Sequence, residues 1–289
     1  MAKQPEVIRD KACMLSWSRS HRWKGKTLAL VPTMGFLHQG HLSLIRKAKA
    51  HADVVVVSIY VNPGQFAPSE DLATYPSDLH GDLQKLADAE VDAAFCPSNL
   101  YDCESDGVPG GAGSGGGNER TVVSCLEAGD GGGGGGHETW IRVERLEKGL
   151  CGKRRPVFFR GVATVVAKLF NIVEPDVAVF GKKDYQQWRI ICRMVCDLDF
   201  GIKVIGSEIV READGLAMSS RNVHLSPEQR EKALSINRSL LQAKYSVQKE
   251  KHSCQDLKNL VVQTITKAGG RIDYVEVSWC SSMKEYNSL

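Results

Sequence analysis

Short apolar runs alternate with amphipathic segments over the first two thirds of the chain. Apolar runs over 27–32, 53–61, 91–96, 177–180 and 203–205 predict buried strands. Between them, segments 41–51, 78–89, 160–173 and 184–198 have the character of amphipathic or apolar helices. Strands that alternate with helices predict a doubly wound, Rossmann-like α/β domain with a parallel sheet that is covered on both faces.

The pattern changes after about residue 206. Ser226-Pro227-Glu228 is a strong helix start, and charged helices are predicted to about residue 249 and over 253–268. The alternating segment 271–277 predicts a strand. We therefore expect a Rossmann-like domain over 1–206 and a smaller α+β domain over 207–289, which looks shortened because the last twelve residues show no clear pattern.

Composition adds one anomaly to this picture. Of the 28 glycines, 14 lie between Gly107 and Gly136, so the chain reads as a globular protein with a flexible insert at about 103–137. The net charge of +3, from 37 basic and 34 acidic residues, gives no argument for nucleic acid. Nine cysteines without a CxxC pair are typical of free thiols in a reducing compartment. Without a signal peptide or an apolar run of about 20 residues, we expect a cytosolic protein with no membrane association.

A histidine motif, TMGFLHQGH (33–41), joins the first apolar run to the first helix. In a doubly wound fold this loop lies at the carboxyl end of a strand, where ligands bind. The two glycines allow close approach of backbone to a phosphate, and His38 and His41 can both face the helix entrance. Histidines at a turn can also be simple caps, but this placement favours a nucleotide site. No GxGxxG motif indicates a dinucleotide.

Three further polar loops are expected at the same edge. YVNPGQF (60–66) supplies Gln65, which can donate to and accept from a small substrate. FGKKDYQQ (180–187) supplies Lys183 for phosphate charge and Asp184, which is either a ribose ligand or a helix cap. AMSSRN (217–222) places two hydroxyls beside a guanidinium, which suits phosphate capture.

Together with DLATYPSD (71–78), RGVATVVAKLF and READGLAMSSRN, these loops closely resemble pantothenate synthetases, the pantoate–β-alanine ligases, over roughly residues 20–277 outside the insert. The histidine and MSSR pieces alone would indicate only the wider nucleotidyltransferase and class I synthetase-like folds. The FFRG form and the insert look like plant members. Phe158 stands where many bacterial relatives have His, so it cannot serve any role of that His.

The resemblance implies a set of site residues. Catalytic roles fall to His41, His38 and Lys183, and no protein ligands for a metal are implied. The implied ATP contacts are Met34, His38, His41, Gly181, Lys183, Asp184, Val210, Met218, Ser219, Ser220 and Arg221. The implied substrate contacts are Gln65, Gln187, Asn62 and Tyr75. The family also implies a homodimer that uses ATP with Mg²⁺, pantoate and β-alanine.

The implied reaction activates the pantoate carboxylate as an adenylate, which the amine of β-alanine then attacks to release AMP. Two alternatives remain at this point: a nucleotidyltransferase of the same fold, and a catalytically impaired isoform with a truncated C-terminus. None of the matched loops lies in the Gly-rich insert. Our hypothesis is that residues 107–136 form a dispensable loop near a dimer interface, whose deletion leaves turnover nearly unchanged.

Overall fold

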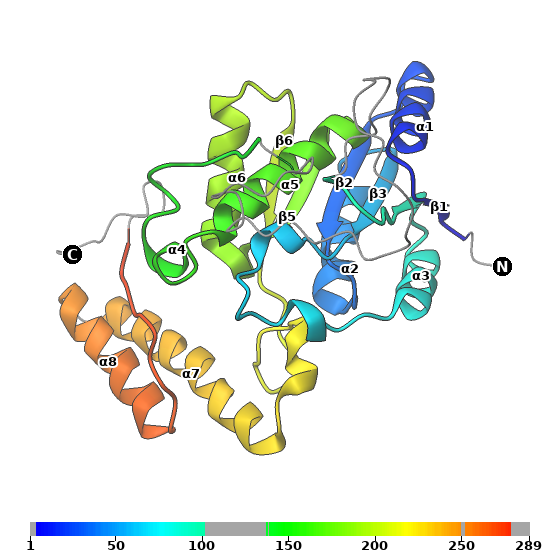
Figure 1. Cartoon of the computed structure of the whole chain (residues 1–289). Coiled ribbons are helices and arrows are strands. Elements are labelled where there is room, and N and C mark those ends of the chain that lie inside the picture. Colours follow the sequence, from blue (N-terminus) through cyan, green and yellow to red (C-terminus); the bar gives the residue numbers. More distant parts are fainter. Residues whose placement is uncertain (1–3, 102–136, 138, 250–251, 279–289) are drawn as a thin grey trace, which may run out of the picture.

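The computed structural model describes residues 4–101, 137, 139–249 and 252–278. It contains a six-stranded sheet with the order β1-β4-β3-β2-β5-β6, in which every neighbouring pair is parallel (Figure 1). The strands are β1 (Glu6–Ile8), β2 (Leu28–Thr33), β3 (Val54–Ile59), β4 (Ala93–Phe95), β5 (Val177–Gly181) and β6 (Lys203–Ser207). The predicted doubly wound α/β fold is confirmed. The Gly-rich insert of the sequence lies outside the described residues, apart from His137.

Helices cover both faces of this sheet, because side chains alternate between the faces along each strand. Leu30 and Val56 belong to the cluster that includes helix residues such as Phe170. Val31 and Val57 belong to a second cluster that includes Ile45. The first face is covered by α1 (Lys11–Trp23), α5 (Phe158–Val173) and α6 (Tyr185–Asp197), and the second by α2 (Gln39–Lys49) and α3 (Leu79–Asp88).

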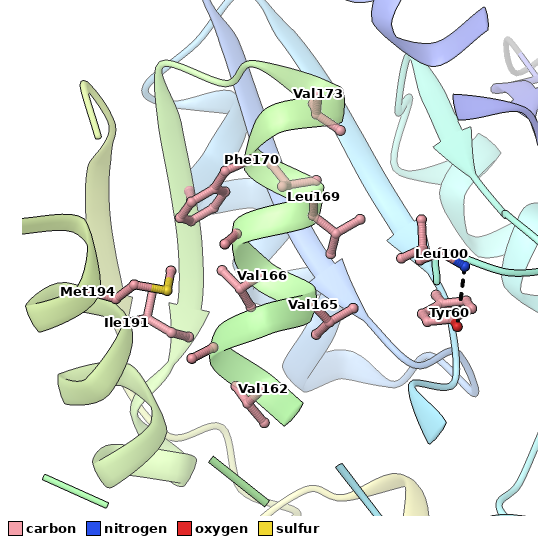
Figure 2. Close-up of a cluster of buried hydrophobic side chains, with 14 of the residues drawn as sticks. Tyr60, Leu100, Val162, Val165, Val166, Leu169, Phe170, Val173, Ile191 and Met194 are labelled. Carbon is pink, nitrogen blue, oxygen red and sulfur yellow. Dashed lines mark hydrogen bonds between the residues drawn. The ribbon is translucent and has the colours of Figure 1, made fainter. Parts of the chain in front are cut away.

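Helix α5 is the most deeply buried of the described helices. Its apolar side chains pack in one cluster with residues of the sheet and of α6 (Figure 2). Val165 and Leu169 lie toward the part of the core that holds Tyr60 and Leu100, whose backbone N–H is 3.4 Å from the Tyr60 hydroxyl (Figure 2). The helix ends at Glu174, whose φ of 48° is left-handed, just before Pro175. A helix that is apolar almost all round is typical of a buried position.

The first turn of α5 is pressed against the turn that follows β3. A Cβ added to Gly161 would lie 2.0 Å from the backbone oxygen of Gly64. Only glycine allows this approach, which brings α5 against the short 3₁₀ helix η1 (Pro63–Gln65). The turn that carries Gln65 is therefore supported directly by the core.

The C-terminal part contains α7 (Pro227–Lys249) and α8 (Cys254–Lys267), which pack against each other below the sheet in the view of Figure 1. Both begin where the sequence predicts. The Ser226 hydroxyl accepts from the Gln229 N–H at 3.2 Å, and Ser253 caps α8 through the Asp256 N–H at 3.1 Å. The strand predicted over 271–277 is wrong. No described residue forms a β-bridge with residues 271–277, and an alternating segment becomes a strand only beside another strand.

The other differences are small or concern short elements. The sequence reasoning omits β1, α1, α4 (Leu150–Arg154) and the 3₁₀ helices η2 (Leu72–Thr74), η3 (Lys182–Asp184) and η4 (Ser220–His224). Within the part of the chain that the structure describes, no helix has the length and apolar character needed to span a bilayer. The six cysteines seen there are free thiols.

Candidate functional site

A cavity of about 260 Å³ opens at the carboxyl ends of β2, β3 and β5. Parallel topology brings the loops after these strands to one edge of the sheet, as predicted. Its walls contain every site residue named from the sequence: Met34, His38, His41, Asn62, Gln65, Tyr75, Gly181, Lys183, Asp184, Gln187, Val210, Met218, Ser219, Ser220 and Arg221. Loops far apart in the sequence thus meet in one place; their individual roles stay predictions.

The two histidines are part of the helix start and of the cavity wall at once. His38 is the N-cap of α2, and its Nδ1 accepts the Gly40 N–H at 3.1 Å. The Nδ1 of His41 accepts the His38 N–H at 3.3 Å, and the two ring centres lie 4.1 Å apart. Because Nδ1 accepts in each ring, the proton of the neutral imidazole sits on Nε2. Each ring is therefore oriented by the backbone and offers one N–H donor.

The same environment keeps both rings uncharged. Burial lowers the pKa of His41 to about 3, and the neighbouring basic groups of His38, Lys183 and Lys85 act in the same direction. Burial also lowers the pKa of His38, again with help from Lys183. At neutral pH the pair consists of two dipolar donors, and Lys183 supplies fixed positive charge beside them.

A buried carboxylate holds the loop before the histidines. Asp82, on α3, accepts the N–H of Phe36 at 2.7 Å and the N–H of Leu37 at 2.6 Å. Its side chain is 1% exposed, and burial raises the pKa of this carboxyl despite the two N–H donors. Phe36 and Gly35 have φ of 50° and 84°, so this loop is tightly bent and Asp82 secures the bend.

The turn after β3 contributes two amides that are bonded to each other. The Nδ2 of Asn62 lies 3.0 Å from the Oε1 of Gln65 and 3.2 Å from the Gly161 carbonyl oxygen. The Nε2 of Gln65 lies 3.5 Å from the sulfur of Met34. Both amides are nearly buried, and both line the cavity.

The loop after β5 has neighbouring residues with different surroundings. Lys183 and Asp184 line the cavity, with Lys183 Nζ 3.3 Å from the Asp184 carboxylate. Asp184 occupies the N-cap position of α6, yet its side chain makes no capping hydrogen bond, so the cap interpretation of this residue is not supported. Gln187 lines the cavity, whereas Gln186 points its amide to the carbonyls of Leu146 and Gly149 at 2.7 and 2.8 Å.

The C-terminal part closes the cavity through a small hairpin and η4. The Met218 N–H bonds the Val210 carbonyl at 3.0 Å, which places both residues side by side in the wall. Ser219 caps η4 by accepting the Arg221 N–H at 3.3 Å. The Ser220 hydroxyl lies 3.1 Å from the Phe36 carbonyl, so η4 touches the histidine loop directly.

Arg221, predicted to capture phosphate, is held by a carboxylate. Its Nε and Nη2 lie 2.6 and 2.9 Å from the two oxygens of Asp71, and its guanidinium lies 4.9 Å from the centre of the Tyr75 ring. The bond from Arg221 holds the pKa of Asp71 below its usual range. The guanidinium lines the cavity in this paired state.

Sequence reasoning missed Arg155, which also lines the cavity. It pairs with Glu70 at 2.5 Å and lies 3.8 Å from the centre of the Phe158 ring. Its signal in the sequence was a short basic run beside FFRG. Glu70 and Asp71 are adjacent, so one short segment holds both Arg155 and Arg221. Asp82 was also missed, because it sits in an ordinary amphipathic helix with no motif around it.

Comparisons with known proteins show the family of this chain. The family model described as Pantoate-beta-alanine ligase matches residues 6–288. The chain is 65% identical to a pantoate–β-alanine ligase of Oryza sativa, over 95% of this chain and 86% of the rice protein. It is 64% identical to one of Arabidopsis thaliana, with 95% and 87% covered.

Solved structures give the same result. A pantothenate synthetase from Thermus thermophilus is 34% identical, with a TM-score of 0.80 over 98% of this chain and 91% of that one. A pantoate–β-alanine ligase from Francisella tularensis, complexed with Beta-gamma ATP and β-alanine, is 32% identical, with a TM-score of 0.66 over 90% and 86%. The chain belongs to the pantoate–β-alanine ligase family.

Proposed function

We propose that this chain condenses (R)-pantoate with β-alanine through a pantoyl-adenylate, with the named residues of the cavity in the roles given below. The ATP-dependent ligase activity follows from family membership. The observation that carries the assignment of residues is the convergence of all the motif loops on one cavity beside a neutral, backbone-oriented histidine pair.

The first step is adenylation. A carboxylate oxygen of pantoate attacks the α-phosphorus of ATP, and the bond to the bridging oxygen of pyrophosphate breaks. Such a transfer depends mainly on positioning and charge stabilisation. His38 and His41 would donate their Nε2–H groups to phosphate oxygens, and Lys183 would neutralise charge on the leaving group. Ser219, Ser220 and the N–H groups of η4 would contact the same phosphates.

The second step is aminolysis. The neutral amine of β-alanine attacks the adenylate carbonyl, AMP leaves with the electrons of the carbon–oxygen bond, and the nitrogen gives up one proton to solvent. Gln65 and Gln187 would hold pantoate through its hydroxyl and carboxylate oxygens, with Asn62 and Tyr75 in the surrounding wall. No Ser or Cys nucleophile is needed, because the adenylate is already an activated acyl group.

Magnesium would enter as MgATP. In the described ranges no group of three or more His, Cys, Asp or Glu side chains is placed to hold a metal. Phosphate oxygens and water would therefore supply most ligands of the ion, which is the usual arrangement for Mg²⁺. The ion would add charge stabilisation at the phosphates beside Lys183.

We further propose a cytosolic homodimer, with residues 1–206 as the domain for nucleotide and pantoate and 207–289 as a small lid. The bonds from Ser220 to Phe36 and from Arg221 to Asp71 support the lid assignment. Light scattering of the purified protein tests the dimer.

One assay tests the function. AMP formation from ATP is measured with pantoate, with and without β-alanine. Dependence of AMP on both substrates is expected. Nucleotide retained in the product would instead indicate a nucleotidyltransferase, and ATP binding without turnover would indicate an impaired isoform.

A further inference from the structure

A tyrosine outside the cavity wall is bonded to the amide turn inside it. Tyr101 follows β4, is 6% exposed, and donates its hydroxyl to the Oδ1 of Asn62 at 2.6 Å. Its ring is fixed by edge contact with His137 at 4.9 Å and by Trp140 at 5.8 Å. The hydroxyl thus reaches the site from a packed aromatic cluster.

The orientation of the Asn62 amide is decided by backbone groups. Oδ1 accepts the N–H of Gly64 at 3.3 Å, and Nδ2 donates to the carbonyl of Gly161 at 3.2 Å. A backbone N–H can only donate and a backbone carbonyl can only accept, so the two ends of this amide cannot be exchanged. The Tyr101 hydroxyl must then be the donor in its bond to Oδ1.

The orientation of the Asn62 amide also determines the orientation of the Gln65 amide. Because Nδ2 of Asn62 donates to Oε1 of Gln65, that oxygen is engaged and the Gln65 amide turns its NH₂ group toward Met34 and the cavity. A group that presents NH₂ suits the carboxylate or hydroxyl oxygens of pantoate. The opposite orientation would place Oε1 against the carboxylate, which can only accept, and repel it.

We propose that Tyr101 is a positioning residue for pantoate: through Asn62 it fixes the Gln65 amide with its NH₂ group toward the substrate. This rests on the proposed function, in which Gln65 contacts pantoate. Without the hydroxyl, Oδ1 of Asn62 keeps the longer bond from the Gly64 N–H, so the Asn62 side chain is held less firmly. Its bond to Oε1 of Gln65 then weakens, and the Gln65 amide loses part of what holds its NH₂ group toward the substrate.

The test is Tyr101→Phe, which keeps the ring packing and removes only the hydroxyl. We expect the KM for pantoate to rise about fivefold, the usual effect of losing one hydrogen bond. The KM values for ATP and β-alanine should stay within about twofold. The matched control is Tyr245→Phe, since Tyr245 is 57% exposed on α7 and should leave all three values unchanged.

A double-mutant cycle separates positioning from general support of the fold. In a Gln65→Ala background there is no amide to orient, so Tyr101→Phe should change single-turnover adenylation at subsaturating pantoate by less than about 1.5-fold. A fivefold loss in both backgrounds, or an equal rise in the KM for ATP, would overturn the proposal. Wild-type protein that forms no AMP with pantoate would instead refute the proposed function, before any variant is compared.

Discussion

Replacing His41 with Ala should slow adenylation at least ~100-fold, the effect of removing one preorganised donor from a site of developing charge. The structure supports this size because His41 is oriented before substrate arrives: its Nδ1 accepts the His38 N–H at 3.3 Å, and its ring centre is 4.1 Å from that of His38. The substitution also leaves the His38 N–H without this partner, which costs stability of about 1 kcal/mol.

The assay is pantoate-dependent release of pyrophosphate in a single turnover, with the melting temperature recorded in parallel. The control is His51→Ala, because His51 follows the end of α2, is exposed, and bonds the Lys47 carbonyl at 3.0 Å, away from the cavity. The control should adenylate at the wild-type rate. A folded His41→Ala protein with near-normal pyrophosphate release would refute the role given to this residue.

The pKa of His41 adds a second test. Because that pKa falls to about 3 in the folded protein, the unfolded state, with an ordinary histidine pKa of about 6.5, binds more protons between these values. The contribution of His41 therefore makes the free energy of unfolding rise with pH from about 3 to 6.5. Urea titrations at several pH values should show a shallower rise for His41→Ala. Equal slopes in both proteins would contradict the burial argument.

Three further substitutions test the frame of the site. Asp82→Asn leaves only one oxygen for two backbone N–H donors, so adenylation should fall about tenfold and thermal unfolding should show a loss of about 1–3 kcal/mol; unchanged kinetics would argue against this anchor. Gly161→Ala should destabilise the protein by about 3 kcal/mol by calorimetry, while Gly149→Ala, which has open space around its Cβ, should change stability by less than about 0.5 kcal/mol. Asp71→Asn should release Arg221, so amide hydrogen exchange in η4 should accelerate about fivefold; equal exchange rates would mean that the ion pair holds nothing in place.

The sheet could be predicted because its central strands are continuous apolar runs that end at turn residues. Strand β1 could not be predicted, because a strand of three residues in which only Ile8 is buried shows no periodicity. Helix α1 could not be predicted for a related reason. Its buried residues are Met14 and Ser18, which are too few to form an apolar stripe. The segment 271–277 shows the converse error, because alternation indicates a strand only when another strand lies beside it.

The loops of the site could be predicted because parallel topology brings the ends of strands together wherever the loops lie in the sequence. The partners of individual side chains could not. Arg221 and Asp71 are 150 residues apart in the sequence, and no local pattern predicts their ion pair. The bond from Phe36 to Asp82, 46 residues away, could not be predicted either. A carboxylate in an amphipathic helix usually faces solvent.

Ser220 and Arg221 are consecutive residues of η4, and each bonds a different segment of the N-terminal part, at Phe36 and at Asp71. Because both side chains belong to one helical turn, movement of that turn away from the N-terminal part breaks both contacts together. We therefore expect the cavity to open in one step rather than by gradual loosening. One of the two contacts is a partly exposed ion pair, so added salt lowers the barrier to this opening. The rate of nucleotide exchange would accordingly depend on ionic strength, through the geometry of a single helical turn.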